Sequence, residues 1–241
     1  MKVYAITDIG KTRPINEDSY YAPREGERYC AVADGMGGHN AGEVASSMAI
    51  QAFSEYMRGV DFITADAICA AVENANYEVF EAAIRDPGMS GMGTTFSALA
   101  EQGETVYIAH VGDSRIYLLR DGEILQATTD HTLVEEMVQK GILTPREARF
   151  HPRRNIITRA LGTEPTVEID IIQVETRPGD VFFLCSDGMT NYVEDVEILN
   201  VVLSGEGWQE KLDRLVAMAL QNGGADNITA LLALPGEDTD R

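Results

Sequence analysis

The sequence predicts an α+β fold of four layers, an α-β-β-α sandwich in which two mainly antiparallel sheets are flanked by helices. Two helical patterns come early in the chain and two come late, and blocks of adjacent short strands lie between them. Because strands and helices do not alternate, a parallel β-α-β sheet is not expected. No linker or low-complexity stretch divides the 241 residues, so we expect one domain over 1–234 and a short acidic tail over 235–241.

The amino-terminal part of the chain is predicted to form three strands and then two helices. The strands are expected at residues 3–9, 19–22 and 28–33. From Ala45 to Met57 the apolar residues are spaced alternately by three and one, which is typical of one face of a helix. A second helix is expected over about 63–85, because Asp86-Pro87-Gly88 ends the pattern.

The middle of the chain is predicted to be a run of strands arranged as a meander. These strands are expected at residues 95–100, 105–110, 115–119 and 124–127. Asp121-Gly122 has the length and composition of a two-residue hairpin turn. Capping-box patterns that begin at Thr132 and Thr144 predict two helix starts. The last third is predicted to contain strands at 167–174, 181–185 and 227–234 and helices at about 194–203 and 208–222.

The composition excludes several classes of partner. With 39 acidic and 19 basic residues the formal net charge is −20, which argues against nucleic acid or an anionic membrane as the main partner. No apolar stretch approaches the roughly 20 residues of a membrane span, and the amino terminus lacks a signal-peptide core. The three cysteines, Cys30, Cys69 and Cys185, lie in apolar contexts and are expected to be buried free thiols. We therefore expect a cytoplasmic protein.

Two apolar runs end in the same three residues, Asp34-Gly35-Met36 and Asp187-Gly188-Met189. Each is predicted to be a buried strand that carries one carboxylate to its tip and then turns on glycine. An unpaired carboxylate is costly in such a place, so the two tips suggest a shared positive partner. The alternative for each is an ordinary turn, as at Asp121-Gly122.

Three further acidic motifs lie at predicted strand ends. They are Asn16-Glu17-Asp18, Asp113 within Val111–Arg115, and Asp226 before Asn227. Taken singly, each fits a turn or cap residue. If they converge, aspartates without a cysteine-pair motif are ligands for Mg²⁺ or Mn²⁺ rather than Zn²⁺. Two such ions can activate a bridging water for attack on phosphorus.

Phosphate chemistry also needs a cationic group and a proton donor. Arg13 lies just before the first acidic motif and can bind two phosphate oxygens, although it also fits a solvent-exposed arginine before a proline. His39 follows two glycines and precedes the first helix, where it suits a general acid. An exposed histidine near a helix start is the alternative.

Six motifs in a fixed order carry a family resemblance. They are Arg13-Pro-Ile-Asn-Glu-Asp18, Asp34-Gly-Met-Gly-Gly-His39, Gly91-Met-Gly-Thr-Thr95, Val111-Gly-Asp-Ser-Arg115, Ser186-Asp-Gly188 and Asp226-Asn227. Together they resemble the metal-dependent serine/threonine protein phosphatases of type 2C, the PPM family, in its compact bacterial form. The resemblance runs from Asp8 to Leu232. It implies hydrolysis of phosphoserine and phosphothreonine in proteins by a metal-bridging water, without a phospho-enzyme.

The resemblance also implies a binuclear Mg²⁺ or Mn²⁺ site with a weaker third ion. Asp34 would bridge the two ions, the Gly35 carbonyl would bind one of them, and Asp187 and Asp226 would hold the other. The remaining implied roles are water-mediated metal binding by Glu17 and Asp18, support of the third ion by Asp113, phosphate binding by Arg13, protonation of the leaving oxygen by His39, and support of the ligands by Ser186 and Asn227. The one departure is Asp130-His131-Thr132, where bacterial relatives often have serine in the third place.

The resemblance implies phosphoprotein partners and a cognate serine/threonine kinase, and we expect a monomer that binds neither nucleic acid nor membrane. Two alternatives stay open. One is a non-catalytic regulatory or binding domain that keeps the fold, and the other is a phosphatase of small phosphorylated metabolites. Hydrolysis of an aryl phosphate with and without Mn²⁺ separates the first alternative from an enzyme.

Residues 140–159 form a basic stretch in an acidic protein. Six basic residues and a single acidic one, Glu147, occur there: Lys140, Arg146, Arg149, Arg153, Arg154 and Arg159. An ordinary charged surface is one interpretation. Our hypothesis is a flap over about 131–162 that docks acidic phosphopeptide segments, chiefly through Arg149, Arg153 and Arg154.

Overall fold

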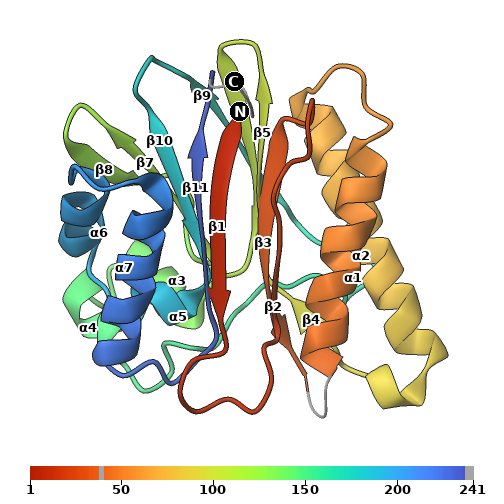
Figure 1. The fold of residues 1–241 in the computed structure, drawn as a ribbon. Helices are drawn as coiled ribbons and strands as arrows, with labels where there is room; N and C mark the ends of the chain where they lie inside the picture. The colour runs from red at the N-terminus through yellow and green to blue at the C-terminus, as the bar shows by residue number, and fades with distance from the viewer. Residues whose placement is uncertain (38–40, 237–241) are drawn as a thin grey trace.

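The structure, a computed structural model, describes residues 1–37 and 41–236, and it confirms the predicted fold class. Two antiparallel sheets pack face to face (Figure 1). The first sheet contains, in order, β1 (Lys2–Asp8), β11 (Ile228–Leu234), β10 (Val181–Cys185), β7 (Arg115–Arg120) and β8 (Glu123–Gln126). The second contains β2 (Asp18–Tyr21), β3 (Tyr29–Met36), β5 (Phe96–Gln102), β6 (Thr105–Val111) and β9 (Asp170–Glu175), with the short β4 (Gly93–Thr94) beside β3.

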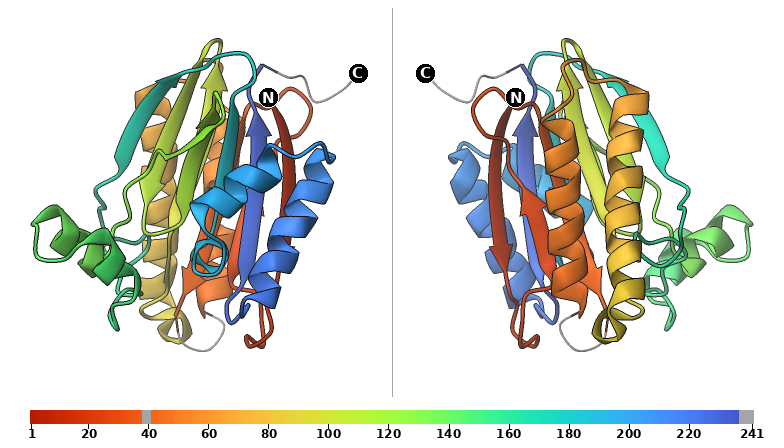
Figure 2. Two further views of the ribbon diagram at one scale, coloured as in Figure 1. Left: turned by 90° about the vertical axis from the view of Figure 1, so that its left-hand side faces the viewer. Right: turned by 90° about the vertical axis from the view of Figure 1, so that its right-hand side faces the viewer.

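Helices cover both outer faces of the sandwich (Figures 1 and 2). α1 (Ala41–Met57) and α2 (Ala65–Arg85) lie on the second sheet, and α6 (Asp195–Val202) and α7 (Trp208–Gln221) lie on the first. The shorter elements are α3 (Leu133–Gln139), α4 (Pro145–Arg149), α5 (Asp187–Thr190) and the 3₁₀ turn η1 (Pro87–Met89). Thr144 and Glu147 form the predicted capping box at the start of α4. None of the helices in the described ranges is long and apolar enough to cross a membrane.

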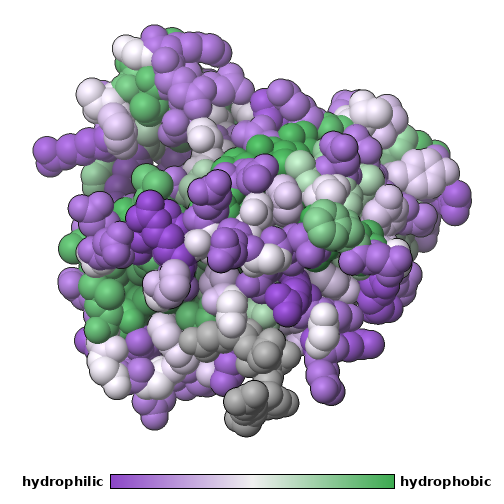
Figure 3. All heavy atoms as spheres, turned by 90° about the horizontal axis from the view of Figure 1, so that it is seen from above, coloured by the Kyte–Doolittle hydropathy of each residue, from purple (hydrophilic) through white to green (hydrophobic). Residues whose placement is uncertain are grey.

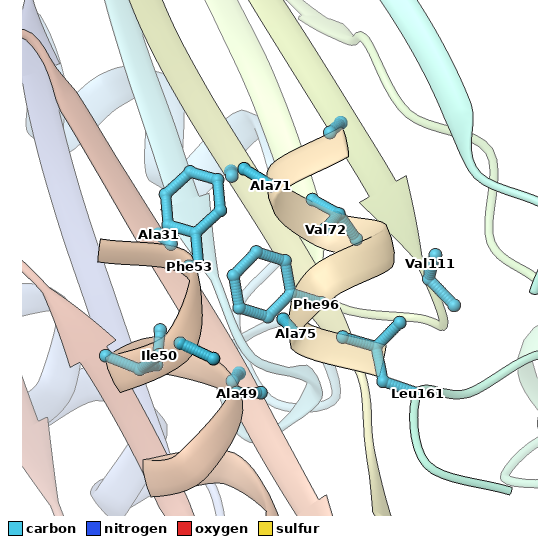
Figure 4. Packing of buried hydrophobic residues seen from close by; sticks show 14 of the residues in the cluster. Ala31, Ala49, Ile50, Phe53, Ala71, Val72, Ala75, Phe96, Val111 and Leu161 are labelled. Atoms are coloured by element: carbon cyan, nitrogen blue, oxygen red, sulfur yellow. The ribbon is translucent and has the colours of Figure 1, made fainter. Parts of the chain in front are cut away.

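Three apolar layers hold the four structural layers together. Within β10, Phe182 and Leu184 pack between the two sheets, whereas Phe183 packs toward the helices of the first sheet. Under α1 and α2 the rings of Phe53 and Phe96 lie 5.2 Å apart between their centroids (Figure 4). Because the central strands are buried on both faces, they have continuous apolar sequences rather than alternating ones.

The prediction that the four central strands form one meander is wrong. β5 pairs with β6 in the second sheet, whereas β7 pairs with β8 and β10 in the first. The chain crosses between the sheets at residues 112–114. The hairpin at Asp121-Gly122 is confirmed, with φ of 54° and 81° as a type I′ turn requires.

Three local predictions were also wrong: the end of β3, the turn at Gly188 and the burial of Cys69. β3 does not end at Asp34 but continues to Met36, because β4 pairs with its last two residues. Asp187 is the first residue of the short helix α5, so the chain does not make a tight turn on Gly188. Cys69 is partly exposed, whereas the other two cysteines are buried as predicted.

Candidate active site

The predicted acidic residues meet at one end of the sandwich, the lower end in Figure 1. Asp18 and Asp34 face each other directly in the pairing of β2 with β3, in the second sheet. Asp187 follows β10 and Asp226 precedes β11, both in the first sheet. The opposite end, where β1 begins and β11 ends, has a mostly hydrophilic surface with separate hydrophobic areas (Figure 3).

Two positions at this end need glycine because neighbouring atoms approach their backbone too closely for a side chain. A Cβ atom on Gly35 would lie 2.0 Å from the carbonyl oxygen of Gly42, and the Gly35 amide donates to the Glu17 carbonyl oxygen at 3.0 Å. A Cβ atom on Gly42 would lie 2.4 Å from Oε1 of Glu17. The first turn of α1 therefore packs against β3 and against the Glu17 carboxylate, which the helix dipole favours.

Ser186 joins the two sheets at the site. Its Oγ donates to Oδ2 of Asp18 at 2.7 Å and accepts from the amide of Thr229 at 3.0 Å. The other carboxylate oxygen of Asp18, Oδ1, is buried without a hydrogen-bond partner. Buried acceptors are nearly always satisfied in folded proteins, so this oxygen is a free ligand position.

Asn227 fixes the loop between β1 and β2. Its Nδ2 donates to the carbonyl oxygens of Ile9 and Ile15 at 2.9 and 3.0 Å, and its Oδ1 accepts from the amide of Glu17 at 2.8 Å. This loop carries Arg13, whose guanidinium donates to Oδ2 of Asp226 at 2.9 Å and lies 3.6 Å from the Glu17 carboxylate. Arg13 is thereby held at the edge of the acidic cluster.

Burial and mutual repulsion raise the pKa values of the clustered carboxyls. Burial comes first in each case and the neighbouring acids add to it, so that the pKa rises to about 7 for Asp18, about 6 for Asp187 and about 8 for Asp113. For Asp34 the same two causes raise the pKa well above its ordinary value. A divalent cation would reverse these shifts, because it favours the charged form of every carboxyl around it.

The donor set suits hard divalent cations. It consists of carboxylates and backbone carbonyls, the ligands that Mg²⁺ and Mn²⁺ take. Within 1–37 and 41–236, no three or more His, Cys, Asp or Glu side chains are grouped closely enough to hold an ion by themselves. Water completes the shell of such ions when few side chains bind them. The orphaned oxygen of Asp18 and the raised pKa values fit a cation site.

Asp113 lies in the segment that crosses between the sheets. The preceding Gly112 has φ of 107°, and a Cβ atom there would lie 2.6 Å from that of Thr95. Thr95 Oγ1 accepts from the amide of Asp34 at 2.9 Å and lies 2.8 Å from Oγ of Ser114. The motif that ends at Thr95 therefore connects the Asp113 loop to β3.

A cleft of about 410 Å³ lies between the acidic end and the basic flap. Its lining includes Asp113 and Asp187 on one side and Arg149, Phe150 and Arg154 on the other. The flap, with α3 and α4, projects from the sandwich (Figure 2, left). Arg153, the third arginine predicted for substrate contact, does not line this cleft.

Two predictions lie outside the described residues: His39, and the part of the acidic tail from residue 237 onward. The sequence reasoning missed Asn191, whose Nδ2 donates to Oδ2 of Asp187 at 3.0 Å. Its spacing of four residues from Asp187 is the signal that points to such a contact on a helix.

Comparison with known sequences places the chain in a family. A family model described as Protein phosphatase 2C matches residues 11–233. The chain belongs to the protein phosphatase 2C family. It is 42% identical over 236 residues to the serine/threonine protein phosphatase PstP of Mycobacterium tuberculosis. The aligned region covers 97% of this chain and 45% of PstP. The chain thus spans less than half the length of that relative.

Relatives of similar length are also named as protein phosphatases. The protein phosphatase PhpP of Streptococcus pneumoniae is 37% identical over the full length of both chains. Among solved structures, the catalytic domain of PstP in complex with two manganese ions is 40% identical, with a TM-score of 0.87 and 96% of both chains covered. The fold described above is therefore that of known protein phosphatase 2C structures.

Proposed function

We propose that this chain is a metal-dependent protein phosphatase that hydrolyses phosphoserine and phosphothreonine. The observation that carries the proposal is the meeting of Asp18 and Asp34 with Asp187 from the opposite sheet, with one buried carboxylate oxygen left unpartnered. The names of the relatives, which are serine/threonine or protein phosphatases, support the substrate class. We propose residues 1–234 as one catalytic domain, with the flap over about 131–162.

For the metal ions, we propose the ligand set that the family resemblance implies. Asp34, Asp187, Asp226 and the Gly35 carbonyl would hold two ions, as Mn²⁺ or Mg²⁺. Glu17 and Asp18 would contribute through water, and Asp113 with Asp187 would hold a weaker third ion. When bound, such ions supply positive charge to the phosphate and lower the pKa of water that attacks it. The two manganese ions of the solved PstP structure support this choice.

The chain's own residues bind and orient the substrate. Arg13 can present two N–H groups to phosphate oxygens, and its hydrogen bond to Asp226 sets the direction of the guanidinium. Ser186 and Asn227 keep Asp18 and the Arg13 loop in place. By its place in the sequence, His39 is proposed to protonate the leaving serine or threonine oxygen.

The cleft beside the flap favours a protein substrate over a small metabolite. Besides two candidate metal ligands it contains the exposed ring of Phe150 and the side chain of Arg154, so a peptide can extend from the phosphate site across the flap. Arg149 lies 3.4 Å from Glu194 and is partly neutralised there. We therefore propose that acidic residues next to the phosphorylated residue contact Arg154, with Arg153 and Arg149 adding to the field.

Three finer proposals rest on the resemblance and on the sequence. The substrates are phosphorylated by a cognate serine/threonine kinase, the chain acts as a monomer, and it works in the cytoplasm. The three unpaired cysteines support the last of these, because a reducing compartment preserves free thiols.

The decisive experiment compares hydrolysis of an aryl phosphate and of a phosphothreonine peptide with and without Mn²⁺. Asp34→Asn is the test variant, and Asp121→Asn in the exposed hairpin is the matched control. We expect metal-dependent turnover that Asp34→Asn abolishes and Asp121→Asn leaves unchanged. Absence of turnover in well-folded protein with Mn²⁺ would favour a regulatory domain, and turnover of small phosphates alone would favour a metabolite phosphatase.

A further inference from the structure

His131 lies outside the acidic cluster but contacts the loop that carries Asp113. Its side chain is 7% exposed, and Nδ1 accepts from the amide of Gly112 at 3.1 Å. The His131 amide in turn donates to the Gly112 carbonyl oxygen at 2.7 Å. One residue thus binds both polar backbone groups of Gly112.

The other ring nitrogen of His131 faces the start of β9. Nε2 lies 3.2 Å from Oδ2 of Asp170, and Arg159 donates to Oδ1 of the same carboxylate at 2.9 Å. Because Nδ1 accepts a hydrogen bond from an N–H group, the proton of the neutral ring is on Nε2, which therefore donates to Asp170. In this tautomer Arg159 and Nε2, which lie 3.1 Å apart, do not bond each other, and both donate to the Asp170 carboxylate.

The surroundings keep the ring neutral. Burial is the main cause that lowers the pKa of His131, and the charge of Arg159 opposes the effect of Asp170. The ring of His110, 4.8 Å away between centroids, is itself buried, which lowers its pKa to about 4. Asp130 is engaged by Arg115 in a two-pronged ion pair, with a shortest distance of 2.6 Å.

The backbone at His131, where the flap begins, is bonded to the segment by which the flap returns. The amide of Thr158 donates to the His131 carbonyl oxygen at 2.7 Å, and the amide of Leu133 donates to that of Ile156 at 2.9 Å. Residues 131–133 therefore lie between the Asp113 loop and the segment by which the flap returns to the sandwich.

We propose that His131 is a positioning residue: its ring, held by Asp170 as the Nε2–H tautomer, fixes the amide of Gly112 and hence the direction in which Asp113 enters the acidic cluster. Gly112 has a φ of 107° and no side chain, so its backbone is freer than that of other residues, and the hydrogen bond from its amide to His131 restricts it. The inference rests on the proposed function for its effect on catalysis, but not for the hydrogen bond itself.

Three substitutions separate the two ends of the ring. His131→Asn keeps an acceptor at the place of Nδ1, His131→Gln keeps a donor at the place of Nε2, and His131→Phe keeps only the volume. His151→Phe is the matched control, since Nδ1 of His151 also accepts a backbone N–H, from Arg153 at 3.2 Å, but within the flap. All four are compared with wild type by thermal unfolding to establish that they fold.

The first readout is made on metal-free protein by nuclear magnetic resonance. We expect the ¹⁵N chemical shifts of the His131 ring to show that Nδ1 is unprotonated and Nε2 is protonated. We also expect amide hydrogen exchange at Gly112 to be faster by about 3- to 10-fold in His131→Gln and His131→Phe, the equivalent of one net hydrogen bond. His131→Asn and His151→Phe should stay near wild type.

The second readout is the Mn²⁺ concentration that gives half-maximal hydrolysis of an aryl phosphate. It should rise in His131→Gln and His131→Phe, with the KM for the aryl phosphate unchanged, and His131→Asn should restore it. The proposal is overturned if Gly112 exchange is unchanged in folded His131→Phe, or if His131→Asn is as impaired as His131→Gln. If His131→Phe does not fold, the Asn and Gln pair decides. If the wild-type protein does not hydrolyse the aryl phosphate, the proposed function is contradicted. The hydrogen-exchange result at Gly112 still tests the role of His131, because it does not depend on activity.

Discussion

Asp18 and Asp34 are paired across β2 and β3, yet the Asp18 side chain and the Asp34 backbone are held by residues from different sides of the site. Asp18 receives a hydrogen bond from Ser186 next to the first sheet, whereas the Asp34 backbone is held by Thr95 of the second. Like charges opposite each other in an antiparallel pair are destabilising. The pair therefore stores a repulsion that a bound cation relieves, and this couples metal binding to stability.

The stability of the metal-free protein should fall as the pH rises. In the folded state the pKa is raised to about 7 for Asp18, about 6 for Asp187 and about 8 for Asp113. The folded state thus binds more protons than the unfolded state between about pH 4 and 8, so stability is highest at the acid end of this window and is lost toward pH 8. Thermal unfolding in chelator should show Tm decreasing from about pH 5.5 to 8, and saturating Mn²⁺ should remove the slope. A Tm that rises over this range without metal would contradict the prediction.

Asp187→Asn should remove one tight metal site and leave the fold intact. The substitution keeps the shape of the side chain but removes the charge, and we expect affinity for one ion to fall by at least about 100-fold. Isothermal titration with Mn²⁺ measures the number of sites. Asp121→Asn, in an exposed hairpin, is the control, and an unchanged number of sites in Asp187→Asn would exclude this residue as a ligand.

Ser186→Ala should weaken both the fold and the metal site. The change removes the hydrogen bond that the Ser186 hydroxyl donates to the Asp18 carboxylate and the acceptor that it offers to the Thr229 amide. We expect the free energy of unfolding to fall by about 1–3 kcal/mol, and half-saturation to need more Mn²⁺. Ser204→Ala is the control, because the Ser204 hydroxyl also makes a 2.7 Å bond, to the Val201 carbonyl oxygen, far from the acids. Equal effects of the two substitutions on Mn²⁺ binding would argue against a role of Ser186 at the site.

Gly188→Ala should be far more costly than an ordinary glycine substitution. Its Cβ atom would lie 1.9 Å from the carbonyl oxygen of Asn227, so α5 or the start of β11 must move. We expect a loss of at least about 1–3 kcal/mol in the free energy of unfolding, together with lower activity. Gly205→Ala, with no atom within 4 Å of the added carbon, should be nearly neutral. Urea unfolding of both variants measures the difference.

Charge reversal in the flap should change substrate choice rather than chemistry. The double substitution Arg153→Glu, Arg154→Glu is expected to raise KM for acidic phosphopeptides several-fold and to leave aryl phosphate hydrolysis nearly unchanged. The difference should shrink at high salt, which screens exposed charges. Arg85→Glu in α2 controls for net charge, since Arg85 is exposed and pairs with its neighbour Glu81 on the same helix. An equal change in KM for the phosphopeptide and the aryl phosphate would contradict the proposed role of the flap.

Sequence patterns predicted most of the elements because helix and strand formation depends on neighbours along the chain. The apolar spacing of α1, the capping box of Thr144 and the turn at Asp121-Gly122 are all local signals, and each agrees with the structure. The motifs around Asp34 and Asp187 also indicated a common end of the molecule. The division of the central strands between two sheets was missed, because the pairing of β7 with β10 depends on residues more than 60 positions apart.

By itself the sequence determined the fold class, the family and the residue types gathered at the acidic end. Only the tertiary structure decided which atoms meet there: Ser186 and Asp18 are 168 positions apart, and no local pattern predicts their hydrogen bond. The same holds for Nδ1 of His131 and the amide of Gly112. The spacing of apolar residues predicts which face of one helix or strand is buried. The contacts of the site depend on how the two sheets pack against each other, and residues far apart in the sequence determine that packing.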